Sequence, residues 1–173
     1  MKKYSKINGF TLLEVVAILV ILSIITAVAV SRLSSNQYKL IAARDTLVSH
    51  LRLAQSRAMN TSVDSVDPSV WGVRFISTTQ YHLFYCATAS TCDPTADANK
   101  QPFLGADSII VNITNNVQVT NGALVLAFNR FGTPYTNANL TTILASQLTL
   151  TLQDNNGNTM TINITPQTGM ISS

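Results

Sequence analysis

One uninterrupted apolar run near the start of the chain constrains the fold more than any other feature. From Phe10 to Val30 the residues are almost all aliphatic, and Glu14 is the only ionisable residue among them. At about 1.5 Å per residue, this run is long enough as a helix to cross a bilayer core of about 30 Å. A basic leader with Lys2, Lys3 and Lys6 precedes it. We therefore expect a membrane-spanning helix with a positively charged N-terminal flank.

The carboxylate of Glu14 needs an explanation, because an acid at the centre of a membrane helix costs about 2.5–3.5 kcal/mol on insertion scales. The cost is smaller near a helix end, yet a plain anchor would avoid it. An intramembrane acid is therefore a functional hypothesis, and its natural partner is a cation at a similar depth.

These residues together resemble the N-terminus of type IV prepilins and of type II secretion pseudopilins. The resemblance is carried by the lysine-rich leader, the Gly9-Phe10 junction and the sequence T-L-L-E that ends at Glu14. It implies that a prepilin peptidase cuts after Gly9 on the cytoplasmic face and N-methylates Phe10. It also implies that Glu14 pairs with the free amine of a neighbouring subunit during filament assembly.

Two simpler interpretations compete with prepilin-like processing. A secretory signal peptide has a basic start, a shorter apolar core and an A-x-A-like site, which Ala27-Val28-Ala29 would supply. The run is too long for that interpretation and contains Glu14. A simple signal anchor explains the length but leaves both the Gly9-Phe10 junction and Glu14 unexplained, so we favour prepilin-like processing.

Composition limits what the rest of the chain can be. With 173 residues, 46% hydrophobic and 11% charged, it suits one membrane segment and one modest domain. The net charge of +3 matches the three leader lysines, so a processed chain would be nearly neutral, which argues against nucleic-acid binding. Beyond residue 60 the chain is rich in Gly, Ser, Thr and Asn, with Lys100 its only lysine, as suits an exported domain held in an assembly.

The two cysteines, Cys86 and Cys92, lie close together in this region. In an oxidising periplasm they would form a disulfide worth roughly 2 kcal/mol. A metal site or a redox pair is the alternative. Only His50 and His82 are available as further imidazole ligands, and no C-x-x-C spacing occurs. We favour a structural bridge and expect no metal and no cofactor.

Residues 31–60 continue with helical periodicity and predict an amphipathic extension of the first helix. Together they would form one rod of roughly 75 Å. Major pilins usually carry a proline about 20 residues into the mature helix, and many carry a glycine before it. The stretch A-V-A-V-S-R that ends at Arg32 has neither, so the backbone has no reason to bend there. The apolar positions are Leu33, Leu40, Ile41, Leu47, Val48, Leu51, Ala54 and Ala58.

The opposite face of this extension is basic. It could contact phosphates or lipid headgroups, or it could be a solvated face that packs against acidic neighbours in a filament, and we favour the second interpretation. The residues are Arg32, Lys39, Arg44, Arg52 and Arg57, against Asp45.

A turn-rich stretch at 60–69 ends the helix, and short strands follow. The expected strands are 70–76, 80–86, 108–113, 117–120, 124–128, 147–153 and 160–164. In the last pair, Leu148, Leu150 and Leu152 face Met160, Ile162 and Ile164 across an Asn-Gly turn, the clearest hairpin signal in the chain. The sequence therefore predicts an α+β fold in which a long N-terminal helix packs on an antiparallel sheet.

A second resemblance concerns the C-terminal half. The stretch L-A-F-N-R-F-G-T-P, with Phe128 and Gly132, and the stretch T-P-Q-T-G-M-I, with Gly169, look like the GspH/FimT-type domain of minor pilins and pseudopilins. Some members of that group bind DNA through arginines near the terminal glycine. No basic residue follows Gly169 here, so nucleic-acid binding is a weak alternative.

Residues 1–9 are therefore expected to be a leader peptide, 10–30 a transmembrane and assembly helix, 31–60 an amphipathic helix and 61–173 a β-rich head. The first hypothesis is a minor pilin or pseudopilin, with its head in the periplasm before it joins a filament. Its expected partners are the prepilin peptidase, other pilin or pseudopilin subunits, the inner-membrane assembly platform and the lipid bilayer. The second is a binding module at a pilus tip, for DNA uptake or for adhesion to a surface ligand. The third is an anchored periplasmic enzyme, which the sequence does not favour because it contains no G-x-S-x-G, metal cluster or glycine-rich phosphate loop.

Overall fold

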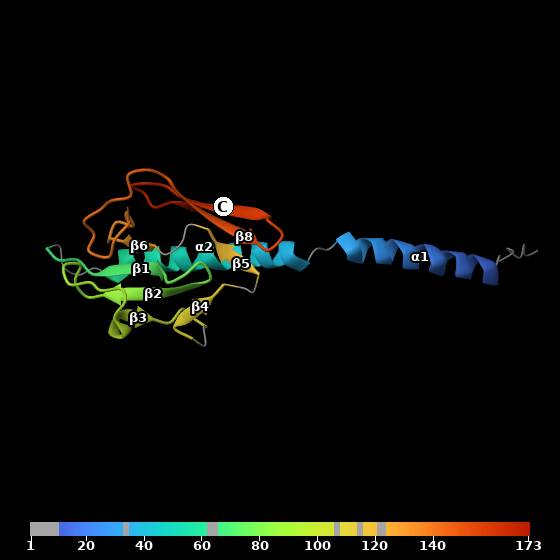
Figure 1. The fold of residues 1–173 in the computed structure, drawn as a ribbon, viewed down its shortest axis with the longest axis horizontal. Coiled ribbons are helices and arrows are strands. Elements are labelled where there is room, and N and C mark those ends of the chain that lie inside the picture. The colour runs from blue at the N-terminus through green and yellow to red at the C-terminus, as the bar shows by residue number, and fades with distance from the viewer. Residues whose placement is uncertain (1–10, 33–34, 62–65, 106–107, 114–115, 121–123) are drawn as a thin grey trace, which may run out of the picture. The chain divides into compact units, whose positions relative to one another are not determined.

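The protein was examined as a computed structural model that describes residues 11–32, 35–61, 66–105, 108–113, 116–120 and 124–173. The chain divides into two compact units, Met1–Ser35 and Asn36–Ser173. In the first unit the described structure is essentially helix α1, Leu12–Arg32. The second unit, the head, holds almost all of helix α2, Ser35–Thr61, and the strands that follow it (Figure 1).

Helix α2 forms because its apolar residues recur on one face, and that face is buried. Leu40 and Leu47 are 1% exposed, and Leu51, Ala54 and Ala58 are fully buried. This confirms the amphipathic pattern seen in the sequence. Leu33 and Ser34 lie outside the described residues, so the continuous rod through both helices stays a prediction.

The first sheet follows the order β3-β2-β1-β6-β7, and β4 also pairs with β2. All its pairings are antiparallel. The strands are β1 Val70–Phe75, β2 Gln80–Cys86, β3 Lys100–Gln101, β4 Ile110–Asn112, β6 Val125–Phe128 and β7 Pro134–Tyr135. A 3-10 turn, Asp97–Asn99, precedes β3.

The second sheet follows the order β10-β9-β8-β5 and contains the hairpin that the sequence predicts. Its strands are β5 Val117–Val119, β8 Leu148–Asp154, β9 Thr159–Ile164 and β10 Ile171–Ser172. The register pairs Leu148 with Ile164, Leu150 with Ile162 and Leu152 with Met160, as expected.

The core of the head joins α2 to both sheets in one apolar cluster. The expected α+β fold is confirmed, but the strands form two sheets where the sequence indicated one. The division arises because β6 pairs with β1 of the first sheet, whereas β5 pairs with β8 of the second. Figure 1 shows strands of both sheets running along α2.

Candidate functional site

The start of α1 places Glu14 in a helix cap. The hydroxyl of Thr11 accepts a hydrogen bond from the Glu14 amide at 3.2 Å, and the Thr11 carbonyl accepts bonds from the amides of Glu14 and Val15. Thr11 is thus the N-cap and Glu14 the third helical residue, the spacing of a capping box. A carboxylate in the first turn also interacts favourably with the helix dipole. Gly9 and Phe10, the expected processing site, lie outside the described residues.

The side chains of α1 are apolar and uncovered. Leu12 is 83% exposed and Leu13 80%, and the large aliphatic side chains from Val15 to Val28 are each about half exposed or more. Such a surface needs an apolar environment or partner. Within the part of the chain that the structure describes, no helix meets the length and apolarity needed to span a membrane.

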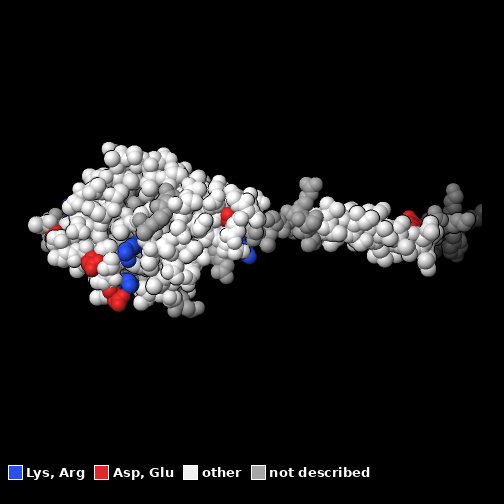
Figure 2. Space-filling model, in the orientation of Figure 1, with Lys and Arg blue, Asp and Glu red and all other residues white. Residues whose placement is uncertain are grey.

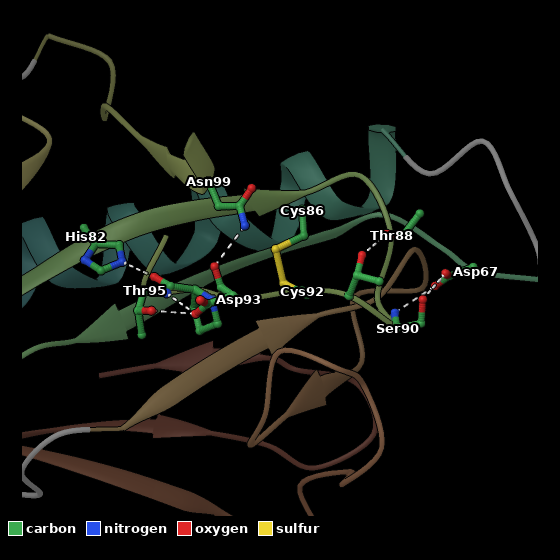
Figure 3. Close-up of a disulfide and its surroundings, with 11 residues drawn as sticks. Asp67, His82, Cys86, Thr88, Ser90, Cys92, Asp93, Thr95 and Asn99 are labelled. Carbon is green, nitrogen blue, oxygen red and sulfur yellow. Dashed lines mark hydrogen bonds between the residues drawn. A yellow bond between two sulfur atoms is a disulfide. The ribbon is translucent and has the colours of Figure 1, made fainter. Parts of the chain in front are cut away.

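In the head, a disulfide joins the end of β2 to the loop that follows it. Cys86 and Cys92 are bonded, their Cα atoms are 5.4 Å apart, and both residues are buried. The Cys92 amide also donates to the Ala89 carbonyl at 3.2 Å, which tightens the loop between them. Figure 3 shows this disulfide loop, residues 86–92, between the segment before β1 and the turn after Cys92.

Two carboxylates hold the disulfide loop and the turn after it in place (Figure 3). Asp67 accepts bonds from the Ser90 amide at 3.0 Å and the Ser90 hydroxyl at 2.5 Å. Asp93 accepts bonds from the amide and hydroxyl of Thr95 at 2.8 and 2.6 Å. These donors, the hydroxyls first, lower the pKa of both carboxyl groups, so both acids are ionised at neutral pH.

His82 anchors the same region from inside the first sheet. It is fully buried on β2, and its Nε2 lies 2.9 Å from the Pro94 carbonyl, which can only accept a hydrogen bond. Nδ1 has no partner among the described residues. Burial lowers the pKa of His82, the hydrogen bond to Pro94 opposes this shift, and the charges of Arg74 and Lys100 add to the lowering. His82 is therefore a neutral, Nε2-protonated histidine with a structural role.

An open groove of about 650 Å³ lies beside the disulfide loop. Four segments line it: the residues before β1, the disulfide loop, the turn between β6 and β7, and the loop after β7. They contribute Asp67, Ser90, Arg130, Phe131, Asn139 and Thr141. Phe131 is 69% exposed, and the Arg130 guanidinium lies over its ring, 4.7 Å from the centroid.

The loops around the groove are held by side-chain amides. Asn129 Oδ1 accepts bonds from the amides of Phe131 and Thr133, at 2.9 and 3.0 Å. Asn137 Oδ1 accepts bonds from the amides of Thr141 and Thr142, at 3.1 and 3.2 Å. These bonds fix the backbone of two irregular segments, so the groove walls are organised before any ligand arrives.

The two glycines of the C-terminal resemblance meet at one side chain of α2. Gln55 Nε2 lies 3.0 Å from the Gly132 carbonyl, 3.2 Å from that of Thr168 and 3.1 Å from that of Gly169. Gly169 has φ +64°, and a Cβ there would lie 2.3 Å from the Gly132 carbonyl oxygen. A close backbone approach therefore requires Gly169, and Gly132 is favoured by its φ of +75°, where a Cβ would also crowd the side chains of Gln55 and Met59. Gln55 joins both turns to the helix.

The basic face of α2 is largely used within the head. Arg44 pairs with Asp45 at 2.8 Å, Arg52 donates to the Ile171 carbonyl at 3.0 Å, and Arg57 lies 4.8 Å from the centre of the Trp71 ring. A phosphate-binding stripe is therefore not supported by these three arginines. Figure 2 shows charged side chains sparsely placed over the visible face of the head.

The described residues do not assemble a metal centre. They contain no group of three or more His, Cys, Asp or Glu side chains that could hold a metal ion. His50, the other histidine, lies 2.8 Å from the Tyr81 hydroxyl and stacks on Phe103 with ring centroids 3.8 Å apart. Its contacts are those of a packing residue between α2 and the first sheet.

Comparison with protein families identifies the N-terminal segment. Residues 4–30 match the family model described as the prokaryotic N-terminal methylation motif. This motif is the signal of type IV prepilins, and its presence at residues 4–30 supports a pilin- or pseudopilin-like precursor. The motif implies processing by prepilin peptidase and assembly with other pilins. Comparisons with curated proteins and with solved structures found no match for the chain.

Sequence reasoning missed two features of the head. Gln55 reads as one polar residue among many on α2, and no local signal marks its three carbonyl partners. The groove combines segments that are far apart in the chain, from Asp67 to Thr141. The sequence singled out two of these segments, the loop between Cys86 and Cys92 for its disulfide and the N-R-F-G turn for its glycine.

Proposed function

We propose that this protein is a minor pilin or pseudopilin, a structural or assembly-initiating subunit of a type IV pilus or a type II secretion pseudopilus. The observation that carries the proposal is the N-terminal methylation motif at residues 4–30. The motif is joined to an apolar helix that begins at a Thr11–Glu14 cap. A GspH/FimT-like head is part of the proposal, and the meeting of Gly132 and Gly169 supports it.

In this proposal, residues 1–9 are the leader, and cleavage leaves N-methylated Phe10 as the first residue. The segment 10–30 inserts in the inner membrane with the head in the periplasm, as the apolar sequence and the basic leader support. During assembly the uncovered aliphatic side chains of α1 exchange lipid for the helices of neighbouring subunits. Glu14 then pairs with the terminal amine of a neighbour, which offsets the cost of holding its charge in an apolar environment.

Processing provides the direct test. The full chain is expressed with and without a prepilin peptidase, extracted from membranes, and measured by intact mass and N-terminal sequencing. With the peptidase we expect a chain that starts at methylated Phe10, and without it an unprocessed chain. A mature chain that starts after Ala29 would show signal-peptide cleavage and overturn the proposal.

Presence in filaments tests the second half of the proposal. Sheared filaments or overproduced pseudopili, probed by immunoblot, should contain the processed chain as a small fraction of the major subunit. A second candidate function, ligand binding by the head at a filament tip, is favoured by the groove beside the disulfide loop.

A further inference from the structure

The groove beside the disulfide loop contains one positive charge that the head does not neutralise. Arg130 is exposed, and among the described residues no carboxylate forms an ion pair with it. Asp67, which lines the same groove, already accepts two hydrogen bonds from Ser90. The groove therefore offers a single guanidinium, the group best suited to bind one carboxylate with two parallel hydrogen bonds.

The one other charged residue of the described groove lining is Asp67, whose carboxylate is bonded to Ser90, and the remaining lining is uncharged and mixes polar, aliphatic and aromatic side chains. The side chains of Asn139 and Thr141 are exposed there and can each donate and accept hydrogen bonds, whereas the Ser90 hydroxyl already donates to Asp67 and can only accept. Phe131 and Tyr135 add aromatic surface, against which the C–H face of a sugar ring can pack. Neutral hydrogen-bonding groups beside an aromatic ring match a ligand with many hydroxyl groups.

Two other ligand classes fit the groove less well. A nucleic acid needs several phosphate contacts, and Arg130 is the only basic residue among the described lining. An extended peptide would need a free strand edge, but the outer edge of β7 is occupied. Tyr135 bridges to Ile143, and the Leu144 amide donates to the Pro134 carbonyl at 3.0 Å.

We propose that this groove binds a short saccharide that carries a carboxylate, with Arg130 on the acid group and Asn139 and Thr141 on the hydroxyls. The groove volume of about 650 Å³ lies in the range of small-ligand sites and would accommodate two or three sugar units. The proposal deepens the second candidate function, ligand binding by the head. It is independent of cleavage at Gly9, so its failure would leave the filament role untouched.

The test uses the full chain in detergent micelles and measures binding by titration calorimetry and saturation-transfer NMR. The acidic probes are 3′-sialyllactose and tri-galacturonic acid, and lactose is the matched neutral probe. We expect at least one of the two acidic probes to bind. If sialyllactose binds, lactose, which lacks the carboxylate, should bind about tenfold more weakly. Absence of binding by both acidic probes at millimolar concentration overturns the proposal.

Variants locate the site. Arg130→Gln should weaken binding of the acidic probe about tenfold, and Asn139→Ala about threefold, with unchanged thermal unfolding. Arg44→Gln is the matched control, because it removes a partly exposed arginine that lies outside the groove and already pairs with Asp45. Equal binding by wild type and Arg130→Gln, or a short DNA strand that binds through Arg130 more tightly than the saccharides, would overturn the assignment.

Discussion

At the scale of single residues, Glu14 has two physical roles that can be separated. Its position three residues after Thr11 is the spacing of a capping box, in which a Glu or Gln side chain can bond the N-cap amide and stabilise the start of α1, and its charge is the proposed partner of a neighbour's amine. Glutamine at the same position keeps the capping geometry and removes the charge. The pair Glu14→Gln and Glu14→Ala therefore separates helix capping from assembly.

We predict that both Glu14 variants insert and are cleaved after Gly9, yet both are depleted from filaments. Loss of one partner of a buried ion pair typically costs about 3–5 kcal/mol, whereas a cap residue is worth about 1 kcal/mol. Immunoblots of membrane and sheared-filament fractions, in a strain that lacks the wild-type copy, measure the distribution. If Glu14→Gln enters filaments at the wild-type level, the charge has no part in assembly and Glu14 is a helix cap.

The side chain of Gln55 bonds two turns in the C-terminal half of the head, the turn at Gly132 and the turn at Gly169. Gln55→Glu would replace a donor amide by a carboxylate that faces three carbonyl oxygens. We expect the free energy of unfolding to fall by about 2–4 kcal/mol, since two part-buried carbonyls and one exposed carbonyl lose their donor and meet a negative charge. Gln37→Glu, at an exposed site of α2, should change it by less than about 0.5 kcal/mol. If chemical denaturation shows that Gln55→Glu and Gln37→Glu change the free energy of unfolding equally, Gln55 does not bridge the two turns.

At the scale of elements, the β8–β9 hairpin depends on one acid in its turn. Asp154 is buried, and its carboxylate accepts bonds from the amides of Asn156 and Asn158 and from the Asn158 side chain, each at 2.9 Å. The Asn158 side-chain bond and the turn amides lower the pKa of this carboxyl below its usual value, and burial partly opposes them. Its contribution to stability is therefore present above about pH 4 and is lost as the pH falls through the lowered pKa.

Asp154→Ala should leave the two turn amides without an acceptor and loosen the end of the hairpin. We predict faster hydrogen exchange at Asn156 and Asn158 and a lower midpoint of thermal unfolding. Asp45→Ala is the control, because Asp45 is exposed and its pair with Arg44 lies on the helix surface, where such pairs contribute little. Unchanged exchange at the turn would show that backbone geometry alone maintains it.

At the scale of the whole molecule, the two units have different solvent requirements. The head has its own core of α2 and two sheets, whereas α1 exposes nearly all of its aliphatic side chains. We predict that a chain of residues 36–173 is monodisperse without detergent and unfolds within a few degrees of the full chain in micelles. Light scattering and thermal unfolding measure this, and an aggregated or unfolded truncated chain would show that the head needs its N-terminal unit.

The stability of the head should also fall on mild acidification. The pKa of His82 is lowered by burial. Below about pH 6.5 the imidazole is therefore protonated in the unfolded chain but still neutral in the folded chain. Stability is then complete above pH 6.5 and declines as the pH falls towards the folded pKa, by at most about 1.4 kcal/mol per pH unit for this group.

His82→Gln keeps a donor for the Pro94 carbonyl and should flatten the decline between pH 7 and pH 5. His50, whose pKa is also lowered by burial, would supply the remaining slope, so the double variant His50→Gln, His82→Gln should be flatter still. Thermal unfolding across this pH range measures both. An unchanged slope in His82→Gln would show that other groups cause the loss.

Much of this protein follows from local sequence, because the forces involved act between near neighbours. The apolar run predicted α1, the three- and four-residue spacing predicted α2, and alternation about Asn-Gly predicted the β8–β9 hairpin with its register. The G-F-T-L-L-E motif indicated a prepilin-type N-terminus from a single stretch.

Tertiary structure decided what depends on contacts between distant segments. Two-residue strands such as β3 and β7 carry no periodic signal, and they exist because neighbouring strands provide hydrogen-bond partners. The division into two sheets, the three carbonyls at Gln55, and the groove between Asp67 and Arg130 arise in the same way. The sequence alone therefore determined the helices, the main hairpin and the N-terminal signal. Packing alone determined where the head presents the guanidinium of Arg130, unpaired among the described residues, because the groove forms only when loops far apart in the chain meet.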